Sequence, residues 1–127
     1  MTREMRLEIF ERELERLLGS SVDHDYVGFS DARDPSRQVL FVVHPGGIYG
    51  EVASAERSVE SALGCLGFAR SGSSYSRDGL PRYARKLACL AELLFGAAFG
   101  SVEGLTVLPV ARAGREAEFR PAVELDA

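Results

Sequence analysis

The chain has few of the residues that proteins use to hold metal ions or to attack substrates. Its 127 residues include two histidines, His24 and His44, and two cysteines, Cys65 and Cys89. A zinc site needs about four ligands at characteristic spacing, and the two cysteines lie far apart in the chain. His24 has acidic neighbours, but adjacent residues on a strand point to opposite faces. These residues therefore predict no metal site, no catalytic pair and no cofactor.

The few thiols and the charged first residues indicate a reducing compartment. Residues 1–6 are charged and lead into a charged helix, so we expect no secretory signal and a cytoplasmic location. Both cysteines fall in apolar helical sequence, where a free thiol usually behaves as a small buried side chain. We therefore expect Cys65 and Cys89 to be reduced, buried and unreactive.

Basic residues are not clustered, and long apolar runs are missing. The formal net charge is −4, and Lys86 is the single lysine. Nucleic acids and anionic membranes are bound by lysines and arginines gathered on one face. The most apolar stretch, residues 87–100, contains Glu92 and is shorter than the roughly 20 residues that a membrane span needs. The sequence therefore predicts neither nucleic acid nor membrane as a partner.

The pattern of apolar residues predicts an α+β fold. Apolar residues at helical spacing predict helices, and β-branched or aromatic runs between turn residues predict strands. We expect helices over 3–18, 54–66 and 80–98, strands over 26–29, 39–43 and 48–53, and edge strands over 68–76 and 105–110. The predicted fold is an antiparallel sheet of three to five strands packed against helices, in the order α-β-β-β-α-β-α.

The length predicts one domain and a C-terminal extension. A chain of 127 residues is about the size of a single domain. After residue 113 the sequence is charged and low in apolar content, as terminal segments that do not pack often are. We expect a single domain over residues 1–112 and a flexible tail over 113–127.

The helix expected over 80–98 suggests an interaction surface. Its second half is apolar almost all round, and helices of this kind are buried on most sides. A small domain has limited core in which to bury such a helix. We therefore hypothesise that a homodimer interface or a groove for a partner includes Leu87, Leu90, Leu94 and Phe95. The alternative is that these residues form the core beneath the sheet.

Several short motifs resemble those of one bacterial family. They include the Tyr26–Phe29 strand, the apolar strand ending at Val43 and the segment 48–54, with an acidic residue near its end. The remaining motifs are Leu63 with Leu66-Gly67-Phe68, Tyr75-Ser76-Arg77, and the helical segment 91–96 ending in glycine. Over residues 3–105 the chain is similar to the TY-Chap proteins, which are type III secretion chaperone-like, and to the related YbjN family.

This resemblance implies a fold like that of the secretion chaperones. Such proteins are acidic dimers that hold an extended partner segment on apolar patches, and the net charge of −4 is compatible with that class. The resemblance supplies no catalytic residues. Our first hypothesis is therefore a non-catalytic chaperone-like or adaptor protein that binds a partner polypeptide as a homodimer.

Two other functions are compatible with the sequence. An immunity or inhibitor protein could meet a basic toxin surface through acidic loop residues, namely Asp23, Asp25, Asp31 and Asp34. A small-molecule-sensing domain could use a pocket between the sheet and the helix over 80–98.

Overall fold

The computed structural model describes residues 1–20, 22–53, 55–100, 102, 104–111 and 120–121. In chain order the elements are α1 (Arg3–Ser20), β1 (Tyr26–Asp31), β2 (Asp34–His44), β3 (Gly47–Ala53), the 3-10 helix η1 (Arg57–Val59), α2 (Glu60–Cys65), β4 (Ala69–Ser71), β5 (Ser74–Leu80), α3 (Ala84–Phe99), β6 (Leu105–Ala111) and β7 (Arg120–Pro121). The predicted α+β class and the order α-β-β-β-α-β-α are confirmed, with more strands than expected.

The strands form one antiparallel sheet. Its spatial order is β4-β5-β3-β2-β1-β6-β7, and every pair of neighbours is antiparallel. The described residues therefore contain seven strands, more than the three to five expected. The sheet is open, because β4 and β7 lie at its two edges. The central strands β1, β2 and β3 are the ones that the apolar runs predicted.

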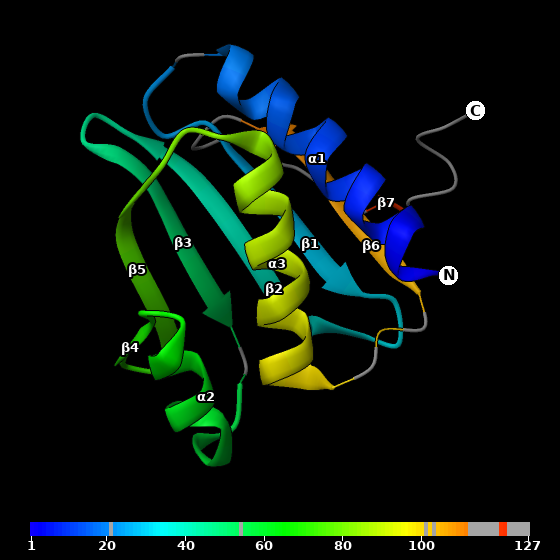
Figure 1. Cartoon of the computed structure of the whole chain (residues 1–127), viewed down its shortest axis with the longest axis vertical. Coiled ribbons are helices and arrows are strands. Elements are labelled where there is room, and N and C mark those ends of the chain that lie inside the picture. The colour runs from blue at the N-terminus through cyan, green and yellow to red at the C-terminus, as the bar shows by residue number, and fades with distance from the viewer. Residues whose placement is uncertain (21, 54, 101, 103, 112–119, 122–127) are drawn as a thin grey trace.

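Both long helices pack on the same face of the sheet. Figure 1 shows α1 and α3 side by side across this face, with α2 near the end of α3 and beside β4. No helix in the described part of the chain covers the opposite face. The molecule is therefore a two-layer structure, in which α3 lies between α1 on one side and α2 on the other.

Alternation along the strands directs apolar side chains toward these helices. In the sheet register Phe29 lies opposite Val39, and Val39 lies opposite Val52. All three are fully buried. The Phe10 ring of α1 meets Phe29 edge-on at 4.8 Å between centroids and stacks on Phe95 of α3 at 5.8 Å. Burial of each such ring stabilises the fold by roughly 1.5–3 kcal/mol.

The segment expected as one edge strand over 68–76 is instead a hairpin. Strands β4 and β5 are joined by the two residues Gly72 and Ser73, and Ser71 pairs with Ser74. Gly72 has a φ of +62°, as the first residue of a type II′ hairpin turn requires. The Gly72-Ser73 sequence inside the expected strand is therefore the turn of the hairpin.

Two helices begin later or are shorter than expected. Leu80, which was expected to open the last helix, is the final residue of β5, where it pairs with Ile48 and is buried, and α3 begins only at Ala84. The helix expected over 54–66 is reduced to η1 and α2, and Leu63 is the one buried residue in α2. Strand pairing has thus overridden the local helical pattern at Leu80.

The predicted tail falls mostly outside the described residues, which exclude 112–119 and 122–127. Arg120 and Pro121 pair with Val107 and Thr106, so these two residues belong to the sheet. None of the described helices is both long enough and apolar enough to cross a bilayer.

Candidate functional site

The four residues expected at an interface do not form an exposed surface. Leu87, Leu94 and Phe95 are buried within the single chain, with at most 1% of each exposed. Leu90 is half-buried and packs against the same core. The hypothesis that these residues form an interface is therefore wrong for Leu87, Leu94 and Phe95. They fill the space between α3, α1 and the sheet, which was the alternative.

The outward face of α3 carries a different apolar residue. Leu93 is 55% exposed, although its neighbour Leu94 is fully buried. Successive helical residues are about 100° apart, so Leu93 lies outside the stripe that faces the sheet. Leu93 was not predicted as a surface residue because this half of the helix is apolar almost all round in sequence. Spacing from Leu87, Ala91 and Leu94 could have identified it.

Leu93 lies in a groove between α2, α3 and the beginning of α1. This hollow, which we call the α2/α3 groove, has a volume of about 580 Å³. Its lining residues are Arg3, Ala62, Cys65, Leu66, Glu92, Leu93, Gly96 and Ala97. Six of these eight residues are apolar or glycine. The groove is thus a largely apolar surface with one cation and one carboxylate.

The two charged residues of the groove differ in their bonding. Glu92 accepts two hydrogen bonds from the guanidinium of Arg6, including one of 2.8 Å from Nε to Oε2. This contact raises the pKa of Arg6, because the bond and the nearby negative charge favour the protonated guanidinium. Arg3 is exposed and has no ion pair with any described residue. The charge left over in the groove is therefore positive.

The cysteines are less buried than expected. Cys65 is exposed at the end of α2, where it lines the α2/α3 groove, and Cys89 is half-buried on α3. The prediction of a buried thiol is wrong for Cys65, because α2 is short and Leu63 is its one buried residue, and Cys89 is only half-buried.

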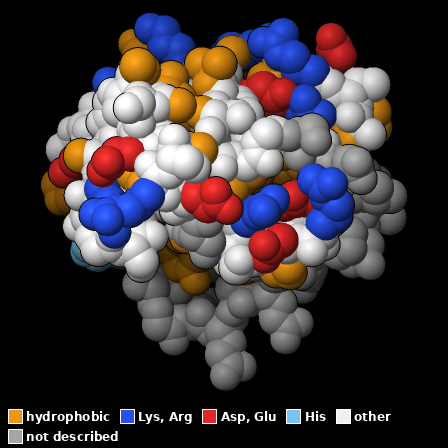
Figure 2. Space-filling model, turned by 90° about the horizontal axis from the view of Figure 1, so that it is seen from below, with side chains coloured by type: hydrophobic (Ala, Val, Ile, Leu, Met, Phe, Trp, Pro, Cys, Tyr) orange, Lys and Arg blue, Asp and Glu red, His pale blue; other side chains and the backbone are white. Residues whose placement is uncertain are grey.

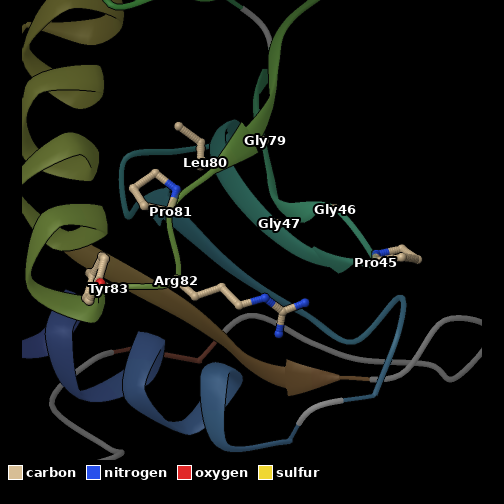
Figure 3. A pocket seen from close by; sticks show the side chains of 8 residues that line it. All are labelled: Pro45, Gly46, Gly47, Gly79, Leu80, Pro81, Arg82 and Tyr83. Atoms are coloured by element: carbon tan, nitrogen blue, oxygen red, sulfur yellow. The ribbon is translucent and has the colours of Figure 1, made fainter.

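A second hollow lies where β5 leads into α3. It has a volume of about 500 Å³ and is lined by the turn Pro45–Gly47 and by the segment Gly79–Tyr83. Figure 3 shows Arg82 extending toward the side of the turn. Its Nη2 atom donates a 2.9 Å hydrogen bond to the carbonyl oxygen of His44. The lining contains no carboxylate, imidazole or thiol, so it offers no acid–base pair of its own.

The two histidines meet beside this second hollow. Their rings lie 5.7 Å apart, and His44 stacks on Tyr49 at 5.3 Å. Nδ1 of His44 is 3.7 Å from a carboxylate oxygen of Asp78. Within the described residues, no three histidine, cysteine or acidic side chains are grouped so that they could hold a metal ion.

The acidic residues considered for toxin binding do not share one surface. Asp25 and Asp31 are buried, and Asp31 accepts hydrogen bonds from the backbone and side chain of Arg33. Asp34 is partly exposed and pairs with Arg37. Asp23 is exposed. Two of the four carboxylates are therefore unavailable to a basic partner.

Charge on the visible surface is mixed. Figure 2 shows acidic and basic side chains interspersed with apolar ones on the face seen from below. No large area of one sign marks this face.

Comparison of the chain with protein-family models, curated proteins and solved structures finds no match. The resemblance to the TY-Chap and YbjN proteins therefore stays a prediction.

Proposed function

We propose that this chain is a non-catalytic, chaperone-like or adaptor protein of the cytoplasm that binds a partner polypeptide. The observation that carries the proposal is the α2/α3 groove, a largely apolar hollow of about 580 Å³ with Leu93 exposed in it. Exposed apolar surface that is rimmed by polar residues is typical of protein-binding sites. The groove is formed by helices, so its shape is held by the same packing that holds the core.

The arrangement of side chains supports binding more than chemistry. The groove holds one thiol, Cys65, but no histidine. A catalytic thiol needs a base or another group that activates it. The carboxylate of Glu92 is already engaged by Arg6. What the groove offers a ligand is therefore apolar contact area.

The test is to capture partner proteins with the wild-type chain and two variants. Leu93→Gln removes the exposed apolar side chain from the groove but keeps a good helix former. Val22→Gln makes the same kind of change at another exposed apolar residue, 43% exposed, beyond the opposite end of α1. Any captured protein should be identified and its binding repeated with purified components.

We expect Leu93→Gln to weaken partner binding by about fivefold to tenfold, because part of a leucine's burial energy is lost. Val22→Gln should bind as the wild type does. Equal binding by all three proteins would exclude the groove as the contact surface. Circular dichroism should show that both variants remain folded, since both residues are exposed.

We propose further that the protein acts as a homodimer. Light scattering of the purified chain should then give twice the 13.8 kDa chain mass over a range of concentrations. The dimer surface would have to use residues other than Leu87, Leu94 and Phe95, because these are buried within one chain. A chain-sized mass at every concentration would contradict the dimer while leaving partner binding open.

A further inference from the structure

We infer that the α2/α3 groove accepts an amphipathic helix of the partner, with carboxylates beside its apolar stripe. This inference rests on the proposed function and adds the chemistry of the segment that is bound. Three features of the groove lead to it, namely the spacing of its residues on α3, the open space at Gly96 and the unpaired charge of Arg3.

The α3 residues in the groove have the spacing that another helix needs. Leu93, Gly96 and Ala97 lie at i, i+3 and i+4, so they share one side of α3. Helices pack by placing the side-chain ridges of one into the grooves of the other. Leu93 supplies a ridge, and the two small residues on the next turn leave a depression.

Gly96 leaves room for close approach. A Cβ atom built at this position meets no heavy atom within 4 Å, so the space beside it is open. Packed helix axes are about 8–10 Å apart, and small side chains at the contact allow the shorter distances. The side wall formed by Ala62 and Leu66 of the α2 region is also apolar. A helix with one apolar stripe fits such a site better than an extended strand, whose edge would need hydrogen-bond partners.

The charge of the groove selects the flanking residues of that helix. Glu92 is neutralised by Arg6, whereas Arg3 has no ion pair with a described residue. Arg3, Arg6 and Glu92 together thus carry a net positive charge, on a chain whose net charge is −4. A partner carboxylate beside its apolar stripe would pair with Arg3. Because the whole chain repels anions, a preference for an acidic helix would have to arise locally.

The experiment uses two synthetic helical peptides with the same leucine and alanine stripe. One carries glutamate and the other lysine at the positions that flank the stripe. A third peptide has the composition of the glutamate peptide in scrambled order, which removes the stripe. Binding of each labelled peptide to the full chain is measured by fluorescence anisotropy at low and at high salt.

We expect the glutamate peptide to bind up to about fivefold more tightly than the lysine peptide at low salt, the range for an exposed ion pair. The preference should shrink as salt rises. Arg3→Gln should remove it, whereas Arg82→Gln, which removes the same charge far from the groove, should not. Leu93→Gln should weaken both striped peptides, and the scrambled peptide should not bind.

Three results would overturn the inference. They are equal or tighter binding of the lysine peptide, a glutamate preference that survives Arg3→Gln, and no binding of either striped peptide. The proposed function is judged separately by its own capture experiment. If both striped peptides bind equally and Leu93→Gln weakens both, the groove still binds polypeptides and only the inferred charge preference fails.

Discussion

Adjacent leucines on α3 have opposite surroundings. Leu94 is fully buried between the helices and the sheet, whereas Leu93 is 55% exposed in the α2/α3 groove. The cost of truncating a leucine depends on the cavity left behind, so the same change should have different effects at these two positions.

We predict that Leu94→Ala lowers the free energy of unfolding by about 2–5 kcal/mol, as expected for a buried leucine. Leu93→Ala should lower it by less than about 0.5 kcal/mol, because an exposed residue leaves no cavity. Urea denaturation of both variants and the wild type measures the difference. Similar losses for the two variants would contradict the burial described for α3.

Asp34 at the start of β2 provides a test by pH. Its pKa lies below the usual value because the Ser36 hydroxyl, at 2.6 Å, and the Ser36 backbone N–H, at 3.1 Å, donate hydrogen bonds to its carboxylate. A lowered pKa in the folded state means that Asp34 contributes stability above the unfolded value of about 3.9. That contribution is lost as the pH falls through the folded value.

We therefore predict that Asp34→Asn loses less stability than the wild type when the pH is lowered from 5 to 2. Asparagine keeps an oxygen that can accept the Ser36 bonds but does not titrate in this range. Ser36→Ala should also make the decline shallower, because it removes the first cause of the pKa shift. Urea midpoints measured across this pH range give the slopes, and a decline as steep as that of the wild type in both variants would argue against the contact.

The burial of single residues shows where a sequence pattern was sufficient to predict which side of a helix faces the core. The helix over 3–18 was predicted from apolar residues at helical spacing, and in α1 these include the buried Leu7, Phe10, Leu14 and Leu17. The same reasoning failed on α3, because an apolar composition on every side hides which residues face inward. Only the packing of α3 against α1 and the sheet separates Leu93 from Leu94.

The helices α1 and α3 are joined by ion pairs of two kinds. Arg6 of α1 and Glu92 of α3 are 16% and 15% exposed and share two hydrogen bonds. Arg85 of α3 and Glu11 of α1 are 62% and 30% exposed and share one bond of 3.0 Å. Partial burial makes the first pair less screened by solvent than the second.

We predict a coupling free energy of about 1–2 kcal/mol between Arg6 and Glu92 in a double-mutant cycle of alanine variants. The Arg85 and Glu11 cycle, which joins the same two helices, should give less than about 1 kcal/mol. Free energies of unfolding of the single and double variants supply both values. If the coupling free energy of Arg6 and Glu92 is no larger than that of Arg85 and Glu11, partial burial does not strengthen the first pair.

Neither ion pair could be predicted from the sequence. Arg6 and Glu92 are 86 positions apart, and no local pattern links such distant residues. The hairpin of β4 and β5 was missed for a different reason. β4 has only three residues and β5 is largely polar, so the alternation that identifies a strand is weak in both.

At the scale of the whole molecule, the fold class followed from local signals and the arrangement did not. Apolar runs predicted the three central strands, and turn residues between them predicted antiparallel pairing. The position of β6 beside β1 depends on contacts between distant parts of the chain. The groove depends on how α2 lies against α3, so its lining residues could not be assembled from the sequence.

The pairing of β1 with β6 also bears on how the protein is made. Asp31 pairs with Leu105, so β1 is synthesised long before its outer neighbour. At about 5–20 residues per second, the ribosome needs roughly 4 to 15 seconds to add the intervening residues. Until then, one edge of β1 has no strand to pair with, and unpaired strand edges favour aggregation. The nascent chain should therefore depend most on ribosome-associated chaperones in the interval before β6 emerges.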